Sequence, residues 1–157
     1  MQNKNAINDI EFEIQRIETL VEKYHPLLNK IKKEEPNFIE MGSLAMLLHS
    51  FYNGLENIFS RIAKKIDEEI PHGEFWHKKL LDRMITINNK RKFAVLTHDT
   101  YEDLKEYLGF RHFSRHAYAF DLDWNLMKDL ILRLTEIKTK VLNEIRTFTK
   151  KISELKK

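Results

Sequence analysis

The segment from residue 111 to residue 118, RHFSRHAY, contains side chains whose types and spacing suit chemistry on a phosphate. Arg111 is a permanent cation whose planar guanidinium can grip a phosphate with parallel hydrogen bonds. His116 lies five positions on, and a histidine can take up and return a proton near neutral pH. Tyr118 adds a phenolic hydroxyl that can be modified. The three residue types together predict a site for phosphoryl transfer.

Metal-independent cleavage of RNA is the reaction that such an arginine and histidine suit. A general base removes the proton of the ribose 2′-hydroxyl, which attacks the adjacent phosphorus, and positive charge stabilises the transition state. We expect His116 to move the proton and Arg111 to hold and neutralise the phosphate. The products would be a 2′,3′-cyclic phosphate and a 5′-hydroxyl. Because DNA has no 2′-hydroxyl, it should not be cut.

The elements that must position these residues are predicted to be helices. Apolar residues recur every three or four positions along residues 7–31, 38–69 and 124–155, which is the period of one buried helix face. A further helix, beginning at Asp99 or Thr100, should carry the motif. With 4 Gly and 3 Pro in 157 residues, the chain has too few turn formers for a many-stranded fold. We therefore expect an all-α fold, an antiparallel bundle of four long helices plus one short helix, as a single domain over residues 1–157.

Several local signals refine this expectation. Pro26 should kink or split the first helix, and Asn37 with Glu40 three positions later forms a capping-box start for the second. Residues 74–84 predict the short helix, and residues 85–99, which lack a sustained period, predict an irregular loop. The inward residues of the short helix should be Phe75, Trp76, Leu80 and Leu81. Gly54, in the middle of the second helix, should mark a close approach to another helix.

The geometry of a helix ending near Tyr118 would separate the two reactive side chains. At about 100° per residue, Arg111 and His116 would lie about 140° apart around the axis. Arg111, Arg115 and Tyr118 would share one face, and His112 and His116 another. A two-fold homodimer that brings two such helices together would place both residues in one shared cleft.

The segment resembles the Arg-x4-His-x-Tyr motif of the HEPN superfamily, in particular the HepT-like toxins of toxin–antitoxin pairs. Arg111 and His116 match the catalytic pair, and His112 matches the polar position that usually follows the arginine. The stretches LHSFYNG (48–54) and YLGFRH (107–112) are similar to the HepT-like subgroup. The resemblance implies a helical bundle with the motif late in the chain and a homodimeric ribonuclease that acts on RNA such as tRNA or mRNA.

The resemblance also implies a mode of control. In HepT-type systems a partner antitoxin, a nucleotidyltransferase, transfers AMP to the tyrosine that matches Tyr118. The added bulk and negative charge at the cleft would repel the phosphates of RNA. Neither a metal nor another cofactor is expected to take part.

Composition narrows the class of protein. Hydrophobic residues make up 42% and charged residues 32%, the balance of a folded helical protein with a charged surface. The absence of cysteine rules out disulfides, zinc–thiolate sites and a thiol nucleophile. We expect a cytoplasmic protein, because no signal-peptide pattern and no apolar run of about 20 residues is found. A net charge of +3 is compatible with RNA but decides nothing.

Other polar residues leave alternatives open. Asn53, on the second helix, is a candidate to line the cleft together with Arg115, although buried hydrogen bonding between helices is the simpler interpretation. That helix also carries the polar residues His49, Tyr52 and Glu56. His112 and His116 have a spacing that can bind a metal, but no third ligand can be named. His77 and the KRK patch at residues 90–92 are expected to face solvent.

Two functions from other classes compete with a ribonuclease. The first is a non-catalytic HEPN subunit that binds substrate or dimerises with a nucleotidyltransferase. The second is a structural helical adaptor, which the strong apolar stripes of the first and last helices favour.

Overall fold

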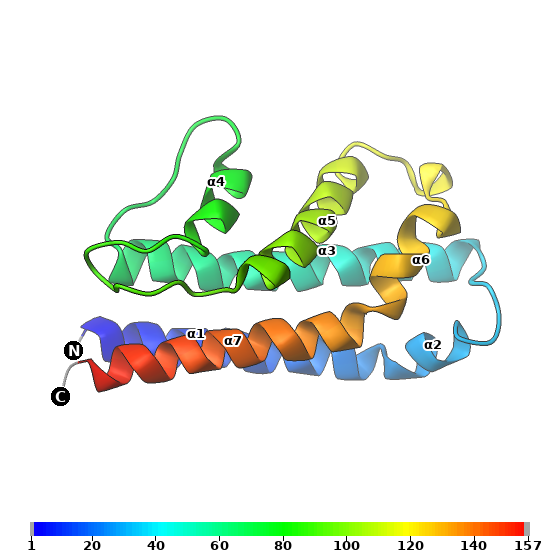
Figure 1. The fold of residues 1–157 in the computed structure, drawn as a ribbon. Helices are drawn as coiled ribbons and strands as arrows, with labels where there is room; N and C mark the ends of the chain where they lie inside the picture. Colours follow the sequence, from blue (N-terminus) through cyan, green and yellow to red (C-terminus); the bar gives the residue numbers. More distant parts are fainter. Residues whose placement is uncertain (1, 156–157) are drawn as a thin grey trace.

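The computed structural model describes residues 2–155, and the regular elements in this part of the chain are all helices, without strands (Figure 1). The predicted all-α fold is thus confirmed. Residues 1, 156 and 157 of the expected single domain lie outside the described residues. The elements are α1 (Gln2–Lys23), α2 (His25–Lys30), α3 (Phe38–Arg61), the π-helix η1 (Ile62–Ile66), α4 (Trp76–Arg83), α5 (His98–Ser114), the 3₁₀ helix η2 (Ala119–Asp121), α6 (Trp124–Leu132) and α7 (Leu134–Glu154).

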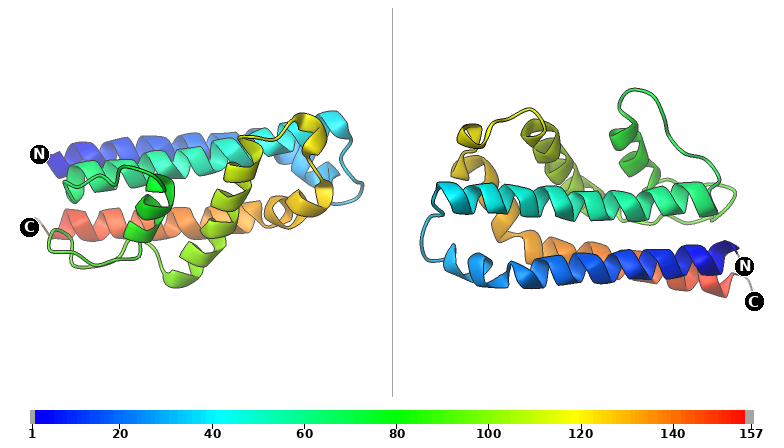
Figure 2. Two further views of the ribbon diagram at one scale, coloured as in Figure 1. Left: turned by 90° about the horizontal axis from the view of Figure 1, so that it is seen from above. Right: turned by 180° about the vertical axis from the view of Figure 1, so that it is seen from behind.

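Three long helices, α1, α3 and α7, run side by side along the molecule (Figures 1 and 2). α1 runs antiparallel to the other two, so that α1 begins and α7 ends at the same end of the molecule. α4 and α5 pack against α3, and α6 leads from α5 back to α7. Over residues 2–155, no helix combines the length and the apolar character that crossing a membrane requires.

The core forms where the predicted apolar stripes of these helices meet. Most of the stripe residues of α1, α3 and α7 are buried in one continuous cluster, as expected from their spacing. Examples are Ile10, Ile14, Ile17 and Val21 from α1, Leu44, Phe51 and Leu55 from α3, and Val141, Ile145 and Phe148 from α7. Burial of these side chains supplies the main driving force for packing the bundle.

Gly54 lies at a close approach of α1 and α3, which confirms its prediction. A Cβ atom at this position would lie only 2.7 Å from Cγ1 of Ile17. Such a separation is far below van der Waals contact, so a larger residue would push the two helices apart.

Two predicted helices are divided. The first breaks at Tyr24, two residues before Pro26, as expected. The last was predicted as one helix over 124–155, but α6 ends at Leu132 and α7 begins at Leu134. A hydroxyl from α5 accounts for the break: Tyr107 donates a 2.7 Å hydrogen bond to the carbonyl oxygen of Leu130, the acceptor that a continuous helix would use. Over residues 2–155 the structure thus holds seven α-helices, with α1 and α2 in the place of the predicted first helix and α6 and α7 in the place of the predicted last.

The start of α4 also differs from the prediction. Leu80 and Leu81 are buried as expected, whereas Phe75 and Trp76 are not inward: Phe75 is 72% and Trp76 38% exposed. Phe75 has φ = 63°, in the left-handed region that bulky residues rarely adopt. This backbone turns the Phe75 ring away from the core.

Arg91 contradicts the expectation of a solvated loop, because its side chain is completely buried. Its guanidinium donates to Asp67, with Nε 2.8 Å from Oδ1, and to three backbone carbonyl oxygens. Asp67 follows the π-helix at the end of α3. The buried arginine therefore ties the irregular loop before α5 to the end of α3.

Candidate functional site

Helix α5 places Arg111 on the buried side of its last turn. Thr97 caps the helix, its hydroxyl accepting from the backbone N–H of Thr100 at 3.3 Å, so the cap lies slightly earlier than predicted. Tyr107 and Leu108 are buried one turn earlier and face the core. Arg111 continues this buried face, with only 8% of its surface exposed.

The helix ends at Ser114, before the motif is complete. The Ser114 hydroxyl donates to the Arg111 carbonyl oxygen at 3.1 Å, where it competes with the backbone bonds of the last turn. Arg115 caps the end, and His116 bonds in a tight turn to Phe113. The expectation of a helix running to Tyr118 is wrong, and so is the angle of about 140° derived from it. Arg115, His116 and Tyr118 are exposed beyond or at the helix end.

Arg111 lies in a cluster of charged and polar side chains from three helices. Its Nη2 lies 3.6 Å from Oε1 of Glu56 on α3, and its Nη1 lies 3.2 Å from Nδ1 of His77 on α4. Glu56 Oε2 is 2.6 Å from the same ring nitrogen of His77. All three side chains are largely buried. The carboxylate of Glu56 therefore compensates the charge of Arg111 inside the protein.

The ring nitrogen of His77 cannot serve both neighbours as a hydrogen-bonding partner. A carboxylate only accepts and a guanidinium only donates, so Nδ1 either donates to Glu56 or accepts from Arg111. The contact with Glu56 is much the shorter, which assigns the Nδ1 proton to the bond with the carboxylate. Arg111 then lies beside the imidazole without a hydrogen bond to it. The indole of Trp76 packs against the His77 ring, with centroids 3.6 Å apart and the ring planes tilted by 31°.

His49 and Tyr52 extend this cluster along α3, on the same face as Glu56. Burial, helped by the positive charges of Arg111 and Arg115, lowers the pKa of His49, which favours a neutral imidazole. Burial raises the pKa of Tyr52, so its hydroxyl keeps its proton. Among the described residues, the Tyr52 hydroxyl and Arg111 Nε are buried without a hydrogen-bonding partner in the protein. Unpaired buried groups of this kind are uncommon and often mark functional sites.

The structure does not bring all the predicted residues together. Asn53 is exposed in a groove between α1 and α3, on a different face of α3 from Glu56. None of the hydrogen bonds and ion pairs found over residues 2–155 joins Arg111 to His116. Tyr118 is 71% exposed, and its ring stacks on Phe120 with centroids 5.2 Å apart. Nor do the described residues contain a cluster of three His, Asp or Glu side chains placed to hold a metal ion.

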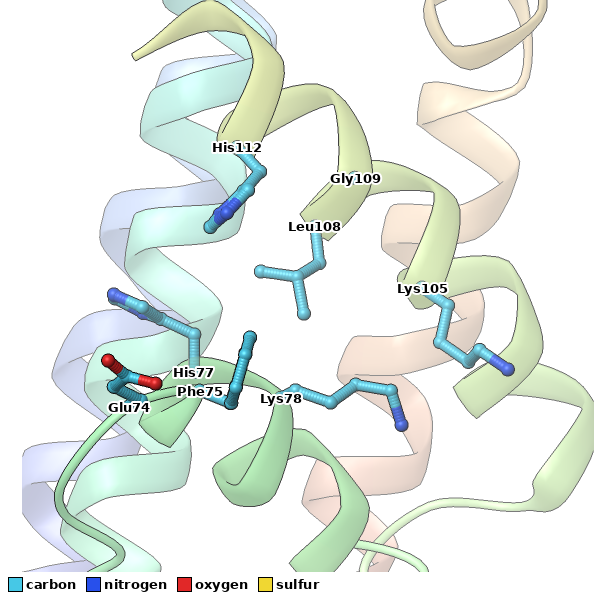
Figure 3. A pocket seen from close by; sticks show the side chains of 8 residues that line it. All are labelled: Glu74, Phe75, His77, Lys78, Lys105, Leu108, Gly109 and His112. Atoms are coloured by element: carbon cyan, nitrogen blue, oxygen red, sulfur yellow. The ribbon is translucent and has the colours of Figure 1, made fainter. Parts of the chain in front are cut away.

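A pocket adjoins the Arg111 cluster, and His112 lies at its edge (Figure 3). It is formed between α4 and α5, and His77 lines it as well. His77 is a site residue that sequence reasoning missed, since it was expected to face solvent. In the sequence, Glu56 stands out only as one of several polar residues on the second predicted helix. Glu56 follows His49 by seven residues and Tyr52 by four, a spacing that places the three side chains on one helix face. This spacing is the signal that distinguishes their face of α3 from the face that carries Asn53.

The comparison with known families agrees with this architecture. A family model described as HepT-like protein matches residues 43–152, which include α4, α5, α6 and most of α3 and α7. The matched region contains the whole Arg111–Tyr118 segment. The fold and the match together define an all-helical protein of the HEPN superfamily. Within it, this chain belongs to the HepT-like family.

Searches of curated proteins and of solved structures gave no significant match. HepT-like HEPN proteins are generally ribonucleases and toxin-like, which supports a nuclease role in coarse terms.

Proposed function

We propose that the protein is a metal-independent endoribonuclease toxin whose active site is formed by Arg111 and His116 in a homodimer. The observation that carries the proposal is the family membership together with an intact Arg-x4-His-x-Tyr segment at the end of α5. Arg111 is held in place at a cluster with unpaired buried polar groups, whereas His116 is exposed just beyond the helix. The guanidinium of Arg111 is thus held by its neighbours, whereas the imidazole of His116 is accessible to a substrate.

In this mechanism each residue has a separate task. Arg111 neutralises the scissile phosphate and stabilises the charge of the transition state. His116 removes the proton of the 2′-hydroxyl or donates a proton to the leaving 5′-oxygen. His112, exposed on the last turn of α5, orients one of them. Arg115 lies between the two catalytic positions and would add positive charge to the cleft.

A dimer supplies what one chain lacks. The Arg111 guanidinium faces Glu56 and His77 within its own bundle, while His116 lies in the exposed linker after Ser114. A second copy placed against this linker would bring its own linker to the same surface. The resulting cleft would carry both residues from both chains.

The proposed control acts on Tyr118. Its hydroxyl-bearing ring is exposed in the same linker as His116, two residues away. A nucleotidyltransferase antitoxin could reach such a ring without unfolding the bundle. AMP attached there would place a phosphate beside the cleft and repel RNA.

Expression in cells and cleavage in vitro test the proposal together. Induction of the wild-type protein should stop growth, and the purified dimer should cut tRNA or mRNA to leave 2′,3′-cyclic phosphate ends. Arg111→Ala and His116→Ala should each lose both effects by at least about 100-fold. His98→Ala removes an exposed histidine at the other end of α5 and should remain active. Wild-type protein that leaves every RNA intact would contradict the proposal.

One observation favours a second function, a non-catalytic subunit that binds substrate or dimerises with a nucleotidyltransferase. Glu56 already forms an ion pair with Arg111. A phosphate of RNA must therefore compete with this buried carboxylate for the guanidinium. In that case the wild type and Arg111→Ala would bind the transferase equally and neither would cleave RNA. Cleavage that depends on Arg111 excludes this alternative.

A further inference from the structure

The pocket between α4 and α5 has the size and the lining of a small-molecule site. Its volume is about 700 Å³. In Figure 3, Phe75 and Leu108 point toward one another across it, with His77 and His112 on one side and Lys78 and Lys105 on the other. The walls are therefore mostly apolar, and nitrogen-bearing side chains surround them.

The backbone at Phe75 adopts a strained conformation beside the pocket. A bulky residue with positive φ is strained, and such strain persists where the surrounding structure requires it, commonly at functional sites. Burial does not explain the strain here, because the Phe75 ring is 72% exposed. Instead, the conformation presents an aromatic face at the mouth of the pocket, where a planar ring could stack on it.

The charges at the mouth favour an anion. Lys78 is already bound to Asp82, with Nζ 2.6 Å from Oδ1, and to the hydroxyl of Tyr101. Lys105 is freer: its nearest carboxylate is the half-exposed Glu102, at 3.4 Å. Lys105 and the exposed His112, on opposite sides of the pocket, are therefore the groups available to the phosphates of a nucleotide chain. Glu74 is the one acidic side chain in the lining and can accept from a base amino group.

The pocket borders the cluster around Arg111. His77 is one of its lining residues and contacts Glu56 and Arg111 through Nδ1. His112 directly follows Arg111 in the chain and borders the same pocket. A ligand in the pocket would thus be separated by the His77 side chain from Arg111, the arginine assigned to the scissile phosphate.

We propose that this pocket binds one nucleotide of single-stranded RNA, next to the nucleotide whose phosphate meets Arg111. The base stacks on Phe75 against Leu108, and the phosphates on its two sides bind Lys105 and His112, one each. The assignment rests on the proposed function, since it names a subsite of that reaction, but binding to the pocket does not require cleavage.

Gly109 permits a test that fills the pocket without disturbing the fold. It lines the pocket from the exposed face of α5, and a Cβ atom there would meet nothing within 4 Å. Gly109→Leu should therefore place a side chain in the pocket, and it also raises helix propensity. Gly109→Ala is the matched control that leaves most of the space open. Gly42→Leu, at a helical glycine of α3 that is equally open, controls for surface hydrophobicity away from the pocket.

The probe is a trinucleotide of 2′-O-methyl RNA, which cannot be cleaved through its 2′-oxygen. Its affinity is measured by calorimetry, with melting curves to check that each variant is folded. Gly109→Leu should weaken binding by about tenfold or more, as should Phe75→Ala. Gly109→Ala and Gly42→Leu should bind as the wild type does. In RNA cleavage, Gly109→Leu should raise KM much more than it lowers kcat.

The outcomes separate the pocket from the proposed function. Probe binding that Gly109→Leu abolishes, in a protein that cleaves no RNA, upholds the pocket and refutes the ribonuclease. Cleavage that Gly109→Leu leaves unchanged upholds the ribonuclease and refutes the pocket. If Gly109→Leu instead alters the oligomeric state in light scattering but not the affinity for the probe, the occupant is protein and the assignment is wrong.

Discussion

Glu56 and Arg111 form a buried ion pair across two helices, with Oε1 and Nη2 3.6 Å apart. The distance makes this a charge contact rather than a hydrogen bond. Glu56 directs its shorter bond to His77, so one carboxylate compensates the arginine and orients the imidazole. Any phosphate that binds Arg111 must share it with this carboxylate.

Removing the charge of Glu56 should therefore destabilise the protein. In Glu56→Gln, Arg111 would stay buried without a counter-charge, and such losses cost about 3 kcal/mol of the free energy of unfolding. Urea denaturation measures the change, and Glu136→Gln on the exposed side of α7 is the control. If the pair matters, Arg111→Met combined with Glu56→Gln should cost less than the sum of the single changes. Strict additivity would show that the two groups do not interact.

The lowered pKa of His49 predicts how stability depends on pH. The unfolded chain takes up a proton at this residue as the pH falls below the ordinary value of 6.5, whereas the folded protein resists it because of burial and the nearby Arg111 and Arg115. Its contribution is therefore fully present above pH 6.5 and is lost as the pH falls through the folded pKa. Melting temperatures between pH 7.5 and pH 5 should drop less in His49→Gln than in the wild type. Parallel curves for the two proteins would contradict this prediction.

Arg91 should be among the most costly residues to replace. Arg91→Met would leave Asp67 and three backbone carbonyl oxygens without a buried donor, at a cost of about 3–5 kcal/mol. Thermal or urea unfolding measures the loss. Lys90→Met is the matched control, because Lys90 pairs only with Glu68 at the surface and should change stability little. Equal effects at positions 90 and 91 would not fit the buried bond network.

Tyr118→Phe should leave the toxicity intact and abolish its neutralisation by the antitoxin. The change removes only an exposed hydroxyl, so RNA cleavage and growth arrest should persist. A co-expressed nucleotidyltransferase antitoxin should then fail to protect the cells, and mass spectrometry should find no AMP on the variant. AMP found on another residue, or protection of cells expressing Tyr118→Phe, would count against this tyrosine as the target.

Local signals predicted much of the fold correctly because they act over a few residues. Asn37 and Glu40 form the capping box that their spacing indicates, with Asn37 Oδ1 accepting from the Glu40 N–H at 2.8 Å. Gly54 marks the close approach of α3 to Ile17, and the apolar stripes of the long helices form the core.

The errors arose where distant groups intervene. Tyr107, on α5, donates a hydrogen bond to a carbonyl oxygen of the predicted last helix, and the helix is interrupted there. Asp67 accepts a hydrogen bond from Arg91 and so holds the Arg91 side chain in the interior. Neither effect can be read from the residues next to the altered one.

By itself, the sequence determined the all-helical fold and the family and supplied the candidate residues for the proposed site, because periodicity and residue type are properties of a local stretch. Only the tertiary structure decided that α5 stops at Ser114, that Arg111 turns inward while His116 stays outside, and that Glu56 and His77 are its neighbours. The physical reason is that burial and ion pairing depend on which helices pack together. That packing brings α3, α4 and α5 to the same point although they are far apart in the chain.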